Sequence, residues 1–153
     1  MCISTWNADE GCQLYRNALQ VLTDSKSMPL DDNVMEKMID LPELLHLVGR
    51  SKKLQVFDVS MNRLNGEIPL SISNCNALKF LDLGFNSLNG SIPIEVVGLK
   101  RLLVFRLGNN SVDGTVPAGF GSIELLEVLD LHNLKLVGNI PEEISNCKFL
   151  LQL

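Results

Sequence analysis

The sequence repeats with a period of 24 residues, and this period is the strongest constraint on how the chain can fold. Four consecutive units share one pattern, and a fifth begins at Leu150. The repeated positions are Leu54, Leu78, Leu102 and Leu126, then Gly66, Gly90, Gly114 and Gly138, then Pro69, Pro93, Pro117 and Pro141. A unit of this length cannot bury its apolar side chains alone, so successive units are expected to stack into a solenoid with one continuous core.

Each unit contains a short alternation of apolar and polar residues. The apolar pairs are Phe57 and Val59, Leu81 and Leu83, Phe105 and Leu107, and Leu129 and Leu131. Alternation with a period of two indicates a strand with one buried face. Apolar residues later in each unit, such as Ile72 in the first, are expected to form the opposite wall of the core. The sequence therefore predicts an α/β right-handed solenoid with short parallel strands along one side.

The two ends of the chain depart from the repeat. Residues 1–50 are expected to form a helical region, with one helix at 12–22 and either one helix at 31–49 or two broken near Pro42. Residues 42–53 fit the outer half of a degenerate repeat. The repeat domain is predicted at 51–153, with complete units from 54, 78, 102 and 126. Because the fifth unit stops in a strand without a polar cap, we expect the chain to be a fragment of a longer protein.

Charge and hydropathy disfavour several classes of protein. The net charge of −5 argues against a nucleic-acid partner, which requires a basic face. No apolar run approaches the roughly 18–20 residues needed to cross a bilayer. The first residues, MCISTWNADEGCQLYRN, lack the basic and apolar regions of a secretory signal peptide. No metal or cofactor is predicted.

Two stretches carry a resemblance to a known family. They are LKFLDLGFNSLNGSIP (78–93) and EEISNCKFL (142–150). Together with the period of 24 residues, they resemble the plant-type leucine-rich repeat of extracellular proteins. Their amino-acid sequences are similar to those of the ectodomains of plant leucine-rich-repeat receptor-like serine/threonine kinases. The resemblance covers about residues 51–153.

The resemblance implies a function at the outer face of the plasma membrane or in the cell wall. The concave face of such a solenoid would recognise a peptide, steroid or protein ligand, or a co-receptor ectodomain, in defence or developmental signalling. Full-length proteins of this kind signal through a transmembrane helix and a cytoplasmic kinase domain. The present sequence has no glycine-rich phosphate loop, no Val-Ala-Ile-Lys strand, no His-Arg-Asp loop and no Asp-Phe-Gly motif. We therefore expect no enzymatic activity from this chain.

A column of asparagines is predicted to be structural. Asn62, Asn86 and Asn110 sit where each unit bends away from its strand, and the bend leaves main-chain groups that the sheet cannot pair. An amide side chain can satisfy both donors and acceptors there. The fourth unit has Leu134 in this column, with Asn133 one position too early. We expect weaker hydrogen bonding at this bend, or an added water molecule, and a gain in stability from Leu134→Asn.

The outward-facing strand residues are the candidate ligand-binding surface. They are Asp58, Phe80, Asp82, Phe85, Val104, Arg106, Asp130, His132 and Asn133. Exposed aromatic groups beside charges are typical of contact patches. The alternative is ordinary cross-strand packing on a solvated sheet. Three aspartates in one column favour a partner with some positive charge, and Arg106 between Asp82 and Asp130 would relieve their mutual repulsion.

The four cysteines fall into two predicted groups. Cys75 and Cys147 share one column three repeats apart, about 14 Å at the usual strand spacing, which is too far for the ~7 Å that a disulfide allows. Both are expected to be buried free thiols. Cys2 and Cys12 could pair with each other in an oxidising compartment.

The remaining motifs concern modification and catalysis. Asn89 and Asn109 each begin an N-glycosylation sequon, Asn-Gly-Ser and Asn-Asn-Ser. The two histidines, His46 and His132, lie far apart in the sequence, and His132 near Asp130 has no nucleophile beside it. No catalytic residue is predicted.

Two other interpretations of function stay open. The chain could be a secreted leucine-rich-repeat protein that inhibits the cell-wall enzymes of pathogens. It could also be a truncated product without independent activity. A transmembrane segment downstream would favour the receptor, whereas a stop soon after a cysteine-bearing cap would favour the inhibitor.

Overall fold

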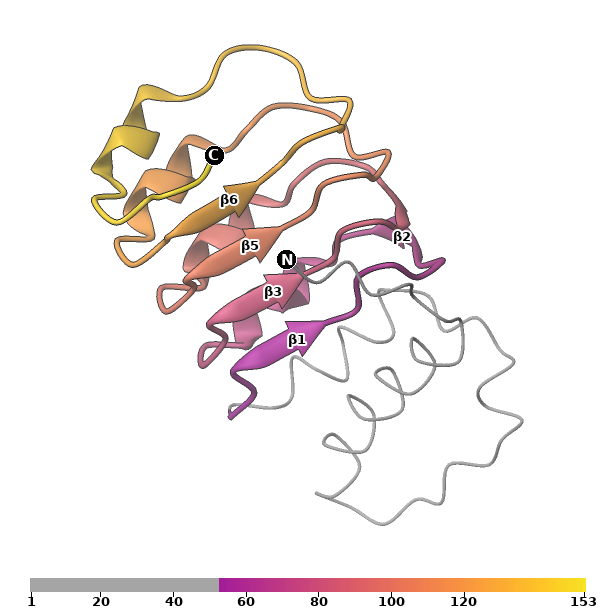
Figure 1. The fold of residues 1–153 in the computed structure, drawn as a ribbon, viewed down its shortest axis with the longest axis horizontal. Helices are drawn as coiled ribbons and strands as arrows, with labels where there is room; N and C mark the ends of the chain where they lie inside the picture. The colour runs from indigo at the N-terminus through magenta and orange to yellow at the C-terminus, as the bar shows by residue number, and fades with distance from the viewer. Residues whose placement is uncertain (1–52) are drawn as a thin grey trace, which may run out of the picture.

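Four parallel strands, one from each repeat, form a continuous sheet along one side of the molecule (Figure 1). They are β1 (Val56–Asp58), β3 (Phe80–Asp82), β5 (Val104–Arg106) and β6 (Val128–Asp130), in that order across the sheet. Each residue pairs with the residue 24 positions later, as in Phe57 with Leu81. The predicted solenoid and its register are therefore confirmed.

The structure is a computed structural model, and it describes residues 53–153. Several expectations lie outside these residues. They are the helical region at 1–50, the degenerate repeat that ends at residue 53, the pairing of Cys2 with Cys12, and His46.

The side opposite the sheet is made of short 3₁₀ turns (Figure 1). They are η1 (Leu70–Asn74), η2 (Ile94–Gly98), η3 (Ala118–Ser122) and η4 (Glu142–Asn146). The repeated proline comes directly before each turn, with φ between −74° and −60°. Proline suits this position because its fixed φ matches the required backbone and its missing N–H is not needed there. No α-helix occurs within residues 53–153.

The core lies between the sheet and the 3₁₀ turns. The inward strand residues Phe57, Leu81, Phe105 and Leu129 are at most 1% exposed, and Ile72, Val96 and Phe120 on the opposite wall are fully buried. Phe105 and Phe120 stack across the core with ring centroids 5.7 Å apart. In the fourth unit Leu131 and Leu136 are only partly buried, since no complete coil covers them. Burial across neighbouring units thus holds the stack together.

The repeated glycine marks a bend in each unit. Gly66, Gly90, Gly114 and Gly138 all have positive φ, between 71° and 89°. A Cβ atom on Gly90 would also lie 2.7 Å from Cγ of Glu67 in the preceding coil. Around this bend, β2 (Asn65–Glu67) and β4 (Ser87–Asn89) form a second parallel sheet that the sequence pattern did not indicate. The backbone conformation therefore favours glycine at all four positions, and the contact with Glu67 adds to this preference at Gly90.

The two described cysteines behave as predicted. Cys75 and Cys147 are both free and buried. Burial raises the pKa of the Cys75 thiol to about 11 and also raises the pKa of the Cys147 thiol. The Cys147 thiol donates to the carbonyl oxygen of Phe120 at 3.3 Å. Both residues are therefore part of the core and poor nucleophiles at neutral pH.

Asparagine side chains connect each bend to the bend of the preceding coil. Asn86 accepts a hydrogen bond from the N–H of Leu64 at 3.0 Å and donates to the carbonyl oxygen of Val59, also at 3.0 Å. Asn110 makes the equivalent bonds to the N–H of Leu88 and the carbonyl oxygen of Leu83. Both amides also donate to carbonyl groups of their own coil. The inter-coil bonds expected of this column are therefore present at Asn86 and Asn110, while the described hydrogen bonds of the Asn62 side chain go to the carbonyl oxygens of Val59 and Ser60 in its own coil.

The ladder is interrupted at Leu134. The N–H of Val112, which is fully buried, would donate to a residue at this position but has no acceptor within residues 53–153. Asn133 does not replace the missing amide, because its side chain donates to Oδ1 of Asn109 on the opposite face at 2.9 Å. Hydrogen bonding at this bend is therefore weaker, as expected from the sequence.

We predict that Leu134→Asn raises the free energy of unfolding by about 1 kcal/mol. The new amide would satisfy the Val112 N–H, and this gain outweighs the apolar burial that a half-buried leucine provides. Urea denaturation followed by circular dichroism measures the change. The matched control is Asn110→Leu, which creates the same defect one coil earlier and should cost about 2 kcal/mol or more. A lower urea midpoint for Leu134→Asn would contradict the explanation.

Candidate functional site

The concave face of the sheet contains a shallow hollow of about 460 Å³. Its floor is formed by Gly84 and Gly108 just after β3 and β5, and its sides include Asp58, Arg106 and Phe85. Both glycines are buried, because the Asp82 carboxylate lies close to Gly84 and the His132 ring lies over Gly108. The hollow therefore presents the side chains around it to another molecule, and not open main chain.

The aspartates of the concave face cap their own strands. Asp58, Asp82 and Asp130 each accept, through Oδ1, the N–H of the residue two positions later, at 3.0, 2.9 and 3.2 Å. These N–H groups follow the last paired residue of each strand, where the sheet provides no acceptor. Short acidic side chains suit this local bond. The column thus has a structural role that its charge alone did not reveal.

Arg106 takes the place of the aspartate in the third unit. Its Nη1 lies 3.5 Å from Oδ2 of Asp82, and its Cζ lies over the Phe80 ring, 5.7 Å from the centroid. The sequence predicted that Arg106 relieves the repulsion between Asp82 and Asp130. In the structure Arg106 forms an ion pair with Asp82. An arginine cannot accept a hydrogen bond. The N–H of Gly108 consequently has no acceptor within the described residues.

Asp82 is the least accessible of the concave carboxylates, with 8% of the residue exposed. Burial raises the pKa of its carboxyl group, and the charge of Asp58 acts in the same direction. The hydrogen bond from Gly84 and the nearby Arg106 both lower that pKa and so oppose the burial. Asp82 therefore has two partners, the Gly84 N–H at Oδ1 and the Arg106 guanidinium at Oδ2.

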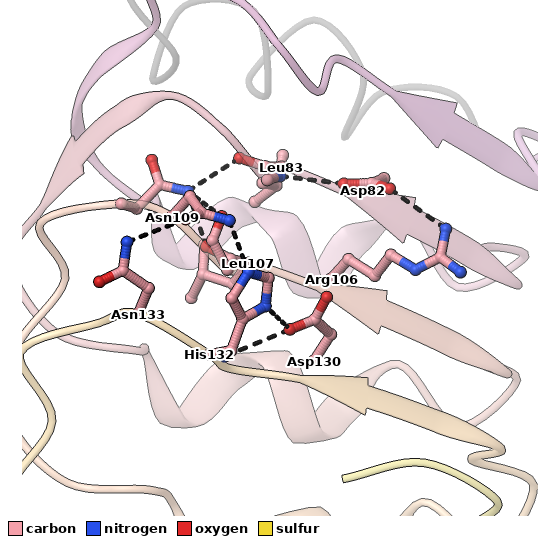
Figure 2. Close-up of polar contacts among 11 residues, drawn as sticks. Asp82, Leu83, Arg106, Leu107, Asn109, Asp130, His132 and Asn133 are labelled. Carbon is pink, nitrogen blue, oxygen red and sulfur yellow. Dashed lines mark hydrogen bonds and ion pairs between the residues drawn. The ribbon is translucent and has the colours of Figure 1, made fainter. Parts of the chain in front are cut away.

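Four polar side chains form a connected chain at the other edge of the hollow (Figure 2). The Asn133 amide donates to Oδ1 of Asn109, the Asn109 amide contacts Nε2 of His132 at 2.6 Å, and Nδ1 of His132 contacts Oδ1 of Asp130. The bonds agree in direction if His132 is neutral, accepts at Nε2 and donates from Nδ1. Asn109, predicted as a glycosylation candidate and not as a binding residue, is a central member of this cluster.

The imidazole of His132 lies over Gly108. A Cβ atom on Gly108 would overlap Nδ1 and Cε1 of the His132 ring. The ring also reaches Phe85, two coils away, in an edge-to-face arrangement with centroids 6.3 Å apart. Gly108 therefore allows residues of the second and fourth coils to meet across the third.

The residue before each ladder position has a left-handed backbone. Met61, Phe85, Asn109 and Asn133 have φ values of 55°, 54°, 58° and 50°. Such values are uncommon outside glycine and asparagine. The conformation turns Phe85 outward, leaving it 51% exposed. Asparagine at two of the four positions was the only sequence signal of this geometry.

The structure divides the predicted binding residues into two groups. Phe80, Asp82 and Arg106 lie together, while Phe85, Asp130, His132 and Asn133 meet around Gly108. Asp58 instead bonds the N–H and hydroxyl of Ser60. Val104 is half-buried and pairs in register between Phe80 and Val128. Gly108 and Asn109 also belong to this surface, although they were not among the residues predicted to bind a ligand.

The two sequons lie in different environments. Asn89 is exposed and ends β4 in the second sheet, away from the concave hollow. Asn109 bonds both His132 and Asn133 on the concave face. Only Asn89 has a side chain free of hydrogen bonds to the described residues.

Comparison with known proteins agrees with this architecture. The family model of the Leucine Rich Repeat matches residues 53–75, 77–99 and 125–147. The chain is a leucine-rich-repeat solenoid. A search of curated proteins finds no match to the chain.

Solved structures of plant receptor ectodomains are similar to this solenoid. PEPR1 in its structure with AtPEP1 is 33% identical, with a TM-score of 0.68 over 70% of this chain and 15% of that one. The plant peptide hormone receptor RGFR1, in complex with RGF2, is 42% identical, with a TM-score of 0.66 over 70% and 17%. The Arabidopsis receptor kinase HAESA, with the peptide hormone IDA and the co-receptor SERK1, is 35% identical, with a TM-score of 0.63 over 65% and 17%. This chain thus spans less than one fifth of each receptor chain.

Metal-binding and membrane-spanning features are both lacking in residues 53–153. No group of three or more histidine, cysteine, aspartate or glutamate residues there is arranged to hold a metal ion. No helix in this part of the chain is both long and apolar enough to cross a membrane.

We predict that Gly108→Ala displaces the His132 ring. The new Cβ would overlap Nδ1, so the interactions with Asp130, Asn109 and Phe85 should break, at a cost of about 1–2 kcal/mol in unfolding free energy. Disappearance of the nuclear Overhauser effect between the Phe85 and His132 rings reports the displacement. Gly98→Ala is the control, since its Cβ would have no neighbour nearer than 3.5 Å. A Phe85–His132 signal that survives in Gly108→Ala would contradict the assigned packing.

Proposed function

We propose that this chain recognises a peptide or a partner ectodomain through the concave hollow, as part of plant receptor-like kinase signalling in defence or development. The proposal depends on one observation: exposed aromatic and polar side chains lie together at one place on a rigid sheet. Phe85 and Arg106 are both substantially exposed there, beside a glycine floor. Interfaces are typically anchored by aromatic and arginine side chains of this kind.

The solved relatives support a ligand of this class. RGFR1 is a peptide hormone receptor, and HAESA binds the peptide hormone IDA in a complex that also contains a co-receptor. Such proteins act at the outer face of the plasma membrane, and we infer the same location for this chain. The kinase assignment for a full-length product depends on resemblance, because residues 53–153 match only the ectodomains.

The mechanism we infer is binding without chemistry on the ligand. The ladder and the capped strands fix the hollow before the ligand arrives, so that little conformational entropy is lost on binding. The hollow has an excess of negative charge, because its lining includes the three carboxylates of Asp58, Asp82 and Asp130 and the single guanidinium of Arg106. A ligand with some positive charge is therefore favoured, as the aspartate column suggested.

We predict that Phe80→Ala and Arg106→Glu each weaken ligand binding about tenfold or more. The first removes the ring beneath the guanidinium, and the second removes the cation and adds repulsion beside Asp82. The immobilised protein would first capture peptides from plant apoplastic fluid. Peptides identified by mass spectrometry would then be synthesised and measured by calorimetry.

The control for charge reversal is Arg101→Glu. Arg101 is exposed in the turn before β5 and does not line the hollow, so its reversal should leave affinity within about twofold. Far-UV circular dichroism should be unchanged in all three variants. If peptides captured by the native chain bind Phe80→Ala and Arg106→Glu equally well, the concave hollow is not the binding surface.

We propose Asn89 as the glycosylated sequon, in preference to Asn109. A glycan on Asn109 would break its bonds to His132 and Asn133, whereas one on Asn89 would project from the exposed end of β4. Expression through the plant secretory pathway should give a glycan-dependent mass increase that Asn89→Gln abolishes and Ser111→Ala does not. Occupancy that depends on Ser111 would contradict this assignment.

A further inference from the structure

The polar side chains at the edge of the hollow form one continuous line of hydrogen bonds (Figure 2). Oδ1 of Asp130 contacts Nδ1 of His132, and the other ring nitrogen, Nε2, lies 2.6 Å from Nδ2 of Asn109. The line continues into the next coil, where Nδ2 of Asn133 lies 2.9 Å from Oδ1 of Asn109. Asn133 is exposed, and its own Oδ1 has no hydrogen-bond partner within residues 53–153. The line therefore connects a titratable ring to a polar group on the surface.

The protonation state of His132 determines the direction of this line. A neutral imidazole with its proton on Nδ1 accepts at Nε2, whereas an imidazolium donates from both nitrogens. At 2.6 Å, the Asn109 atom that faces Nε2 must be a donor in the first case and an acceptor in the second. Asn109 therefore presents its NH₂ group to a neutral ring and its oxygen to a charged ring.

A reversal at Asn109 passes on to Asn133. When the Asn109 oxygen turns toward the ring, its NH₂ group turns toward Asn133, which must then present its own oxygen to accept. The oxygen and nitrogen of an amide are so alike in size and position that a half-turn of each amide needs no movement of the main chain. The outer group of Asn133 thereby changes from an oxygen, which accepts, to an NH₂ group, which donates.

We propose that His132 is a pH-dependent switch of the recognition surface: its protonation reverses the hydrogen bonds through Asn109 and turns the exposed amide of Asn133 from an acceptor into a donor. The reversal itself is independent of the proposed function, and only its effect on a ligand rests on that function. Histidine is the side chain whose charge ordinarily changes between about pH 5 and 8. A change of pH within this range would select the direction of the line.

The packing around His132 suits both directions. The ring lies over Gly108 and has the Phe85 ring at its side, with centroids 6.3 Å apart. An aromatic ring can contact a charged imidazole as well as a neutral one. Asp130 accepts from Nδ1 in both states. The ring can therefore gain a proton in place, so that the response is confined to the two amides.

The charged side chains that share the hollow with His132 belong to four residues of the described chain. They are Asp58, Asp82, Arg106 and Asp130. The neighbours of the ring in the third coil, Gly108 and Asn109, are uncharged, and so is Gln152 on its other side. A proton on His132 consequently reduces the excess negative charge of the hollow. A basic ligand should therefore bind the protonated form less tightly.

Two substitutions separate the titration of the ring from the reversal of the amides. Asn109→Asp places two acceptor oxygens in the middle of the line, so the Asn133 NH₂ group stays directed inward whatever the charge of the ring. Aspartate is close to asparagine in shape and also tolerates the left-handed backbone at this position, where φ is 58°. His132→Phe keeps an aromatic ring over Gly108 and beside Phe85 but removes the titrating group.

The first measurement is NMR of the full chain without ligand, between about pH 8 and pH 5. In the native protein the nuclear Overhauser effect between the Asn109 NH₂ protons and the His132 ring should be lost as the ring becomes charged. The Asn133 NH₂ signals should shift with the same midpoint. In Asn109→Asp the ring should titrate without this shift of Asn133, and in His132→Phe the shift should be absent. An Asn109–His132 effect that persists beside a charged ring, an equal Asn133 shift in Asn109→Asp, or a ring of constant charge would overturn the switch.

The second measurement uses histidine-free synthetic copies of peptides that the immobilised protein captures. Their affinity for the native protein should fall about three- to tenfold from pH 8 to pH 5. The fall should be absent in His132→Phe, which keeps the three aspartates of the hollow. Equal falls in the two proteins, or none in the native protein, would overturn the effect on binding. Failure to capture any peptide would count against the proposed function alone, because the first measurement decides the reversal by itself.

Discussion

The hydrogen bond between an asparagine amide and the main chain of the preceding coil is the interaction on which the rest of the molecule depends. Each coil must leave its strand and turn across the end of the core, and the turn exposes donors and acceptors that the sheet cannot reach. Asn86 and Asn110 satisfy these groups in their own coil and in the coil before it. Burial of apolar side chains favours stacking, and the amides pair main-chain groups that the stacked coils would otherwise leave without partners.

The same bends also shape the surface that faces a ligand. At each bend the residue before the ladder position has a left-handed backbone and projects from the concave edge, including the fourth coil, where Leu134 replaces the asparagine. Phe85 and Asn109 occupy this position in successive coils, and both contact His132 of the fourth coil. The arrangement of the candidate site therefore follows from the same bends that hold the solenoid together.

Much of the fold could be predicted from the sequence, because a constant period fixes both the register of the sheet and the inward columns. Phe57 and Leu81 pair as the spacing of 24 residues requires. The free cysteines followed from the same geometry, since residues three coils apart cannot reach each other. The second sheet formed by β2 and β4 was missed because its residues show no alternating pattern.

The candidate site was less predictable because its geometry depends on which main-chain groups remain unpaired. The sequence placed Asp82 and Arg106 in one outward column, but not the hydrogen bond from Gly84 that occupies the carboxylate of Asp82. It also could not indicate that His132 would extend over Gly108 to reach Asn109, because that contact depends on a missing side chain in the neighbouring coil.

Two departures from the repeat illustrate how location decides between a defect and a site. Leu134 removes an acceptor inside the bend, and the N–H left without one belongs to Val112, which is fully buried. No ligand can reach that donor, so the substitution only weakens the stack. Arg106 removes an acceptor on the concave face, and the N–H left without one belongs to Gly108, which is buried beneath the His132 ring. The residue that causes this loss is itself exposed, with its guanidinium paired to Asp82 and lying over the Phe80 ring, so in a repeat protein an exception to a column gains functional meaning when the side chain that replaces the repeated one can be reached from outside.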